Sequence, residues 1–102
     1  MSRKSEYQKM QDAADRASAL LKTLGHPGRL MILCNLAEGE RSVGDLADEL
    51  EITQSALSQH LARMRSEGLV ETRRDSQNVF YSVTDGEIRA LIKSLYKIFC
   101  PK

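Results

Sequence analysis

The sequence predicts a single, mainly α-helical domain with one small β-hairpin, and its length and two kinds of pattern support this fold class. The chain has 102 residues, enough for one hydrophobic core and too few for two. Apolar residues recur at steps of three and four along most of the chain, the spacing of a buried helical stripe. Near residues 69–83, β-branched and aromatic residues instead flank a short polar turn. We therefore expect one domain over residues 1–102, serving one function.

Composition and charge narrow the class of protein. Hydrophobic residues make up 41% of the chain and charged residues 28%, which suits a folded domain with a hydrated surface. The net charge of +1 does not by itself indicate a nucleic-acid partner, but residues 38–51 hold six acidic side chains and one basic, between two segments of net positive charge. The longest apolar run, residues 30–34, is too short for a bilayer span or a signal sequence. We therefore expect a cytoplasmic protein that does not insert into a membrane.

Two helices are expected in the N-terminal third of the chain. Residues 5–24 place their apolar side chains along one helical stripe, and Gly25 is expected to end this helix. Pro27 suits the first position of the next helix, residues 27–37, because its missing N–H would have no partner there. This second helix is apolar nearly all round, which indicates the buried centre of the domain.

Two further helices are expected, joined by a tight turn. Ser42 is a suitable N-cap for a short helix over residues 43–50, and Thr53 is a suitable N-cap for a longer helix over residues 54–67. Because about three residues join them, the two helices are expected to form a helix-turn-helix.

A β-hairpin and a closing helix are expected after this pair. Strands over residues 69–74 and 79–83 flank a polar turn at residues 75–78, and a hairpin in this position forms a wing beside the helix-turn-helix. Thr84 and Glu87 predict a capping box at the start of the last helix.

The first and last helices each keep an apolar stripe that so short a chain has few other elements to cover. In the last helix the stripe consists of Ile88, Leu91, Ile92, Leu95 and Phe99. We therefore expect a homodimer in which the first and last helices pair across a two-fold axis. The alternative is that both stripes pack within one monomer.

The second helix of the helix-turn-helix carries a short polar face that predicts contact with double-stranded DNA. With its leucines turned to the core, helical spacing leaves exposed Gln54, Ser55, Ser58, Gln59, Ala62 and Arg63. Glutamine and arginine can make paired hydrogen bonds to base edges in the major groove, and serine can bond to bases or phosphates. Each residue could instead be an ordinary solvated side chain; the helix-turn-helix context favours the DNA interpretation for the group.

The second helix of the pair, residues 54–67, is called the reading helix. Its C-terminal end and the wing supply candidate contacts to the DNA backbone. Arg65, Arg73 and Arg74 would bind phosphates, and Gln77 and Asn78 would reach the backbone or the minor groove beside it. The acidic segment belongs to the preceding loop and helix, so it need not face the DNA. A two-fold dimer would place its reading helices about 34 Å apart on a palindromic site.

Three runs of the sequence resemble the ArsR/SmtB family of winged helix-turn-helix repressors. These runs are HPGRLMIL (26–33), SVGDLA (42–47) and QSALSQHL (54–61). The likeness extends over nearly the whole chain, with one departure at Glu51, where helix-turn-helix sequences often have glycine and where we expect backbone strain. Within the family, ILC at residues 32–34 and CP at residues 100–101 are similar to the BigR/SqrR-like branch, whose members sense persulfides and other reactive sulfur species through a cysteine pair.

The resemblance implies a redox role for Cys34 and Cys100. In the family fold the last helix passes over the second, which would bring the two thiols near each other. The implied mechanism is that the reduced dimer binds palindromic operator DNA and represses transcription. It would release the DNA when reactive sulfur species bridge the two cysteines as a disulfide or polysulfide. Taken alone, Cys34 is also explained as a small buried hydrophobe, so a repressor without an inducer stays an alternative.

Metal sensing, the commonest activity elsewhere in the family, would need clustered ligands that this sequence does not supply. Residues 43–50 contain no cysteine and the last helix contains no histidine. We expect His26 to make a local structural contact and His60 to be a partly buried packing residue. Two thiolates alone leave a metal shell incomplete, so no metal or cofactor is expected, although a metal- or metalloid-responsive repressor stays an alternative.

A thiol enzyme is the rival interpretation from another functional class. The sequence has no Cys-x-x-Cys motif, and so small a helical domain offers no evident substrate cleft. A thiol enzyme would also not explain the exposed polar face of the reading helix. We therefore do not expect an enzyme.

Overall fold

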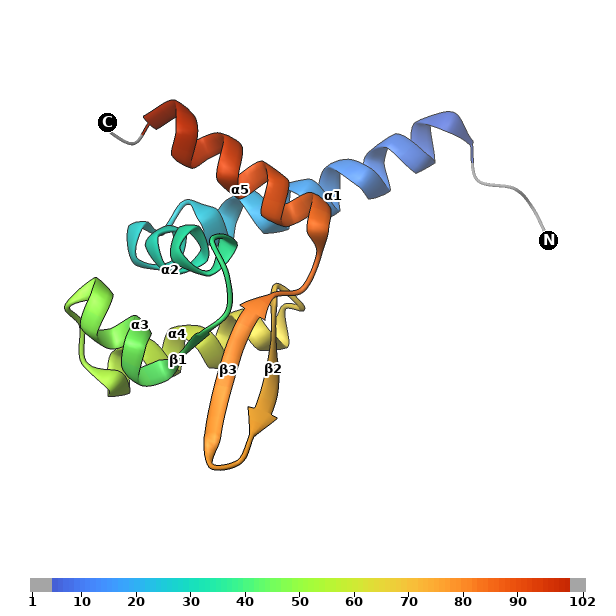
Figure 1. The fold of residues 1–102 in the computed structure, drawn as a ribbon. Coiled ribbons are helices and arrows are strands. Elements are labelled where there is room, and N and C mark those ends of the chain that lie inside the picture. Colours follow the sequence, from blue (N-terminus) through green and yellow to red (C-terminus); the bar gives the residue numbers. More distant parts are fainter. Residues whose placement is uncertain (1–4, 100–102) are drawn as a thin grey trace. The chain divides into compact units, whose positions relative to one another are not determined.

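Five helices and three short strands make up residues 5–99, the part of the chain described by the computed structural model (Figure 1). The elements are, in order, α1 (Glu6–Leu24), α2 (Pro27–Ala37), β1 (Arg41–Ser42), α3 (Val43–Leu50), α4 (Gln54–Ser66), β2 (Val70–Asp75), β3 (Asn78–Val83) and α5 (Gly86–Phe99). The chain divides into two compact units, one up to Leu30 and one from Met31 onward. The mainly helical fold class with a small hairpin is confirmed.

The first unit consists chiefly of α1, whose start and end match the sequence pattern. The Ser5 side chain caps the helix by accepting a hydrogen bond from the Gln8 backbone N–H at 3.1 Å. At the other end, the Gly25 N–H donates to the Leu21 carbonyl at 2.8 Å. Most of α1 is exposed, and its exposed side chains include the large apolar Tyr7 and Met10. This helix therefore presents apolar surface that its own unit does not cover.

The second unit has a core to which α2, α3, α4, α5 and the strands β2 and β3 contribute. The fully buried side chains of this core are Ile32, Leu33, Leu36, Leu46, Leu57, Leu61, Met64, Val70, Val83 and Ile92. Burying a side chain of this size contributes about 1.5–3 kcal/mol to folding. Three of these residues lie on α4, so the core fixes which face of that helix points outward.

The helix-turn-helix is formed by α3 and α4, with the caps that the sequence predicts. Ser42 accepts a hydrogen bond from the Asp45 N–H at 3.2 Å, and Thr53 accepts one from the Ala56 N–H at 3.1 Å. Between the helices, Glu51 takes the left-handed conformation, with φ 55° and ψ 45°. A side chain with a Cβ is strained there, which confirms the expectation drawn from the missing glycine.

The sheet has three antiparallel strands in the order β1, β3, β2, and the sequence predicted only the last two. No strand was expected before the Ser42 N-cap; β1 is two residues long, and pairs Arg41 with Tyr81 and Ser42 with Phe80. So short a strand has no readable alternation and exists only through this distant pairing. The hairpin itself is tighter than expected, because Asp75 still pairs with Asn78 and only two residues form the turn.

The predicted capping box at Thr84 and Glu87 is wrong, because α5 begins one residue later. The Thr84 N–H still donates to the Leu69 carbonyl at 3.0 Å, which extends the pairing of the hairpin and keeps Thr84 out of the helix. The Asp85 carboxylate instead accepts hydrogen bonds from the N–H groups of Glu87 at 2.6 Å and Ile88 at 3.3 Å. A carboxylate at this position also interacts favourably with the helix dipole.

Replacing Glu51 by glycine should raise the free energy of unfolding by up to about 1 kcal/mol. Glycine avoids a left-handed penalty of about 1–2 kcal/mol, and the greater freedom of the unfolded chain offsets part of this gain. Urea unfolding followed by circular dichroism, at fixed protein concentration, measures the change. Glu51→Ala is the matched control, because it removes the charge and keeps the Cβ. Equal stabilisation by both variants would show that the charge, and not the backbone, is responsible.

Candidate DNA-binding surface

The outward face of α4 is exposed and mostly polar. Leu57, Leu61 and Met64 are 0% exposed, and the side chains on the opposite face are Gln54, Ser55, Ser58, Gln59, Ala62 and Arg63. Within residues 5–99, none of the polar side chains in this set makes a hydrogen bond or ion pair. Their donors and acceptors are therefore available to a partner outside the domain.

The charge distribution along α4 suits a polyanionic partner. Its first turn contains no acidic residue, and its last turn contains Arg63 and Arg65, both exposed. The N-terminal end of a helix carries partial positive charge from its unpaired N–H groups, which attracts phosphate. Exposed glutamines along such a helix can in addition form paired hydrogen bonds with adenine.

The hairpin of β2 and β3 forms a wing whose closed end projects beyond α3 and α4 (Figure 1). Arg74, Gln77 and Asn78 are exposed near that end, and no side chain in the described part of the chain bonds to any of them. In the strand register Arg74 is opposite Val79, whereas Arg73 is opposite Phe80. Because successive residues of a strand point to opposite faces, Arg73 and Arg74 lie on opposite faces of the sheet.

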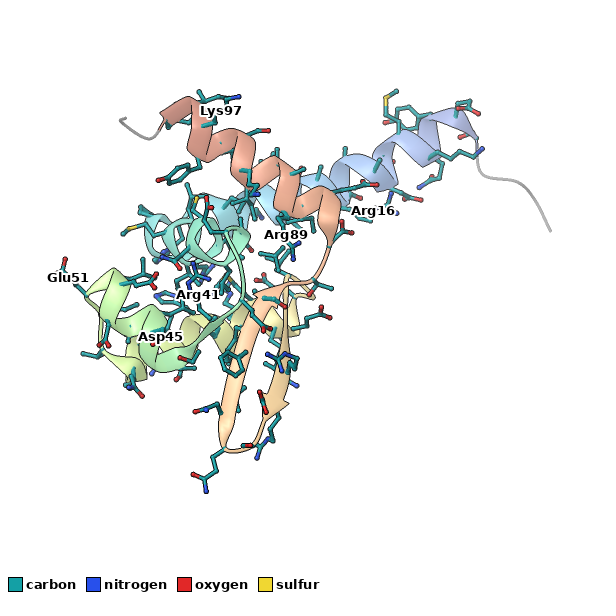
Figure 2. All side chains as sticks on the ribbon, viewed as in Figure 1. Arg16, Arg41, Asp45, Glu51, Arg89 and Lys97 are labelled. Atoms are coloured by element: carbon teal, nitrogen blue, oxygen red, sulfur yellow. The ribbon has the colours of Figure 1, made fainter. Side chains whose placement is uncertain are left out.

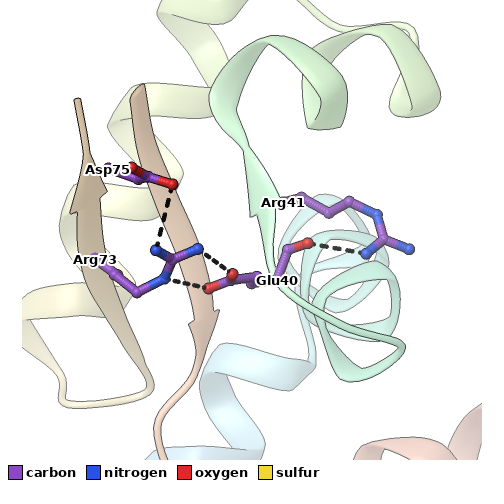
Figure 3. Close-up of polar contacts among 4 residues, drawn as sticks. All are labelled: Glu40, Arg41, Arg73 and Asp75. Atoms are coloured by element: carbon purple, nitrogen blue, oxygen red, sulfur yellow. Dashed lines mark hydrogen bonds and ion pairs between the residues drawn. The ribbon is translucent and has the colours of Figure 1, made fainter. Parts of the chain in front are cut away.

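Arg73 differs from the other predicted DNA contacts because it is held within the domain (Figure 3). Its Nε and Nη2 atoms donate to the two carboxylate oxygens of Glu40, at 3.2 Å and 2.5 Å. Nη1 lies 3.9 Å from the Asp75 carboxylate, and the guanidinium carbon lies 5.0 Å from the centre of the Phe80 ring. Glu40 could not be predicted as a partner of Arg73 from the sequence, because only the pairing of β1 with β3 brings the two residues together.

The Glu40–Arg73 pair is stable in its ionised form at neutral pH. The hydrogen bond from Arg73 lowers the pKa of Glu40 below its ordinary value, and the same bond raises the pKa of Arg73. A lowered carboxylate pKa adds stability above the pKa of the unfolded chain, which is lost as the pH falls through the folded value. Both groups are solvent-exposed, so screening weakens this contribution.

The acidic side chains are concentrated on α3 and the segment before it. Asp45, Asp48 and Glu49 are exposed on α3, and Figure 2 shows Glu51 pointing outward from the end of that helix. Arg41 lies 3.5 Å from Glu49 and neutralises part of this charge. The α4 helix itself contains no acidic residue, so its outward face carries no carboxylate.

Only one of the two predicted sensing cysteines lies in the part of the chain that the structure describes. Cys34 lies on α2 and is partly buried, whereas Cys100 lies outside residues 5–99.

The two histidines lie apart from each other in the sequence. His26 is exposed before α2, and His60 is partly buried on α4. Across the described residues no group of three or more histidine, cysteine or acidic side chains could hold a metal ion. Nor does any described helix have the length and apolar character to cross a membrane.

A known family matches the centre of the chain. Residues 26–72, from the residue before α2 into β2, match the family described as "Bacterial regulatory protein, arsR family". The matched region includes the whole helix-turn-helix and the exposed face of α4.

Individual relatives extend the likeness over most of the chain. The transcriptional activator HlyU from Vibrio cholerae is 46% identical over 93 residues, which cover 91% of this chain and 86% of HlyU. The structure of its reduced form matches with a TM-score of 0.85, covering 92% of this chain and 99% of that one. The biofilm growth-associated repressor of Xylella fastidiosa is 47% identical over 91 residues, covering 89% of this chain and 80% of its own.

Two further structures share the fold. The transcriptional repressor BigR from Xylella fastidiosa matches with a TM-score of 0.82 at 44% identity, covering 96% of this chain and 100% of that one. The homodimeric winged helix-turn-helix domain of Mb0332 from Mycobacterium bovis matches with a TM-score of 0.78 at 28% identity, covering 96% and 89%. The chain therefore belongs to the ArsR family of bacterial regulatory proteins, which are winged helix-turn-helix transcriptional regulators and not enzymes.

Proposed function

We propose that this protein is a homodimeric transcriptional repressor that binds palindromic operator DNA and releases it when reactive sulfur species bridge Cys34 and Cys100. The two units would act together as one DNA-binding domain over residues 1–102. The observation that carries the proposal is the outward face of α4, because its polar side chains are exposed and make no bonds within the described chain. The names of the relatives support a transcriptional regulator, since they include an activator as well as repressors.

In the proposed complex α4 lies in the major groove. The side chains that would contact base edges or adjacent phosphates are Gln54, Ser55, Ser58, Gln59 and Arg63. Arg65, Arg74, Gln77 and Asn78 would contact the backbone beside the groove. The near-neutral net charge is compatible with this binding, because only α4 and the wing need to approach the phosphates.

The exposed apolar residues of α1 and α5 support the proposed dimer. On α5, Leu91, Ile98 and Phe99 are 40%, 70% and 78% exposed. On α1, Tyr7 and Met10 are 74% and 73% exposed. Burying apolar surface of this kind is worth about 25 cal/mol for each Å² removed from water. A two-fold dimer formed by these helices would set two copies of α4 about one DNA turn, roughly 34 Å, apart.

The proposed sulfur response uses chemistry that two thiols can perform without a cofactor. A thiolate of one cysteine attacks the outer sulfur of a persulfide, RSSH, and forms a protein persulfide with release of the thiol RSH. The second thiolate then attacks the inner sulfur of the protein persulfide, forming a disulfide and releasing hydrogen sulfide. The two cysteines are oxidised and the outer sulfur is reduced. A second persulfide would supply the additional sulfur atom of a trisulfide and release a second RSH.

The bridge would act on DNA through the helices it joins. It would tether the end of α5 to α2, and α5 also belongs to the proposed dimer interface. A coupling of about 1–3 kcal/mol between bridge formation and DNA binding lowers the affinity about 5- to 150-fold. Such a change is sufficient to relieve repression.

Replacing Gln59 by alanine should weaken operator binding about 5- to 150-fold for each protomer of the dimer, because one paired contact to a base is worth about 1–3 kcal/mol. Affinity for an unrelated duplex should not change, since the phosphate contacts remain. Fluorescence anisotropy with the promoter of the protein's own operon and a scrambled duplex measures both. Gln11→Ala, at an exposed glutamine on α1, is the matched control. Equal operator affinity of the Gln59→Ala variant and the wild type would contradict the reading role of this residue.

Replacing Leu91 and Ile98 together by glutamate should convert the dimer to a monomer, because both exposed apolar side chains lie seven residues apart on one face of α5. Sedimentation at micromolar concentration reports the state. Lys93→Glu, at an exposed site on another face of the same helix, should remain dimeric. If the wild-type protein itself sediments as a monomer, the proposed dimer is wrong and both stripes must be explained within one copy.

Replacing either Cys34 or Cys100 by serine should leave operator binding intact and abolish release by a low-molecular-weight persulfide, because neither variant can form the bridge. Anisotropy before and after persulfide treatment, with reversal by a reductant, measures the response. Mass spectrometry of the treated wild type distinguishes a disulfide from a longer sulfur chain. A Cys100→Ser protein that still releases DNA would refute the bridge, and a wild type that never responds would favour the repressor without an inducer.

A further inference from the structure

The cluster of Glu40, Arg73, Asp75 and Phe80 joins segments that are distant in sequence. Glu40 precedes β1, Arg73 and Asp75 belong to β2, and Phe80 belongs to β3, the strand between them. Figure 3 shows the Arg73 side chain directed to the Glu40 carboxylate and flanked by Asp75. The interaction therefore crosses the whole width of the three-stranded sheet.

The geometry of the cluster depends on the planar shape of the guanidinium group. Two parallel hydrogen bonds, from Nε and Nη2, reach the two oxygens of one carboxylate. A lysine ammonium group carries the same charge but cannot make this paired contact. The guanidinium also lies 5.0 Å from the centre of the Phe80 ring, within the range of a cation–π interaction.

The local charge makes Arg73 a poor phosphate ligand. Two carboxylates, from Glu40 and Asp75, lie near one guanidinium, so the three side chains together carry a net negative charge. A phosphate would have to displace the Glu40 carboxylate and approach Asp75. Arg74, on the opposite face of the sheet, has no bonded side-chain partner within residues 5–99. The alternation of the strand thus separates two neighbouring arginines into different surroundings.

The cluster also connects the wing to the helix-turn-helix. Glu40 is followed directly by β1, and β1 ends at Ser42, whose side chain caps α3. A bond that holds β2 to Glu40 therefore limits the movement of the wing relative to the start of α3.

We propose that Arg73 is a positioning residue, which with Glu40 fixes the wing to the helix-turn-helix, and that Arg74 makes the wing's phosphate contact. This inference rests on the proposed DNA-binding function, and it revises the sequence-based assignment of Arg73 to phosphate binding. The conservative substitution by lysine separates the two roles. Lysine replaces arginine at a phosphate contact, but it cannot replace the paired bond to Glu40.

The salt dependence of operator affinity tests the proposal. Arg74→Gln should flatten the plot of log affinity against log salt by about 0.9 for each protomer, because one phosphate contact is lost. Arg74→Lys should restore the slope. Arg73→Gln should lower the affinity several-fold at every salt concentration without changing the slope, and Arg73→Lys should behave in the same way. If Arg73→Gln flattens the slope and Arg73→Lys restores it, Arg73 binds phosphate and the proposal is wrong; unchanged affinity in both variants also overturns it.

Hydrogen exchange of the DNA-free protein provides a second readout that does not depend on DNA binding. Arg73→Gln and Glu40→Gln should each speed the exchange of the amides that pair β1 with β3 several-fold, and the double variant should show no further increase. Arg74→Gln should leave these rates unchanged. Failure of the wild type to bind any duplex would refute the proposed function alone, whereas unchanged exchange in the Arg73→Gln variant would refute the positioning role alone.

Discussion

The burial of one face of α4 is the constraint on which the rest of the account depends. Leu57, Leu61 and Met64 are completely removed from solvent, and their spacing allows only one rotation of the helix about its axis. Turning α4 to bury its polar face would expose these three side chains and leave glutamine and arginine groups in the core without partners. The hydrophobic core therefore determines which side chains of α4 are presented to solvent and available for the proposed contact with DNA.

Strand alternation in the wing places two adjacent arginines in different surroundings. Arg73 and Arg74 have the same charge and are neighbours in sequence, but their surroundings differ because the strand points them to opposite faces. One guanidinium is bonded to a carboxylate from a distant segment, and the other has no bonded partner in the described residues. A count of basic residues near the helix-turn-helix is therefore larger than the number whose guanidinium groups are without a carboxylate partner in the described residues.

Local signals in the sequence predicted the helices and most of the candidate site. N-caps, glycine stops and apolar spacing are properties of adjacent residues, and they located α1 to α4 to within one residue. The errors arose where distant segments meet: β1 exists only through its pairing with β3, and Thr84 stays in the hairpin because of its bond to Leu69. The Glu40–Arg73 bond has the same origin. Cys100 lies outside the described residues, so its pairing with Cys34 stays a prediction.

An NMR titration of the reduced, isotope-labelled protein with its operator duplex tests most directly whether DNA binds the outward face of α4. We expect the largest shifts on the side-chain amides of Gln54 and Gln59 and on the tip of the wing at Asn78. Resonances of the acidic residues of α3, such as Asp48, should move little. Shifts centred on α3 with the amides of α4 unperturbed would contradict this mode of binding, because DNA would then approach a surface other than the outward face of α4.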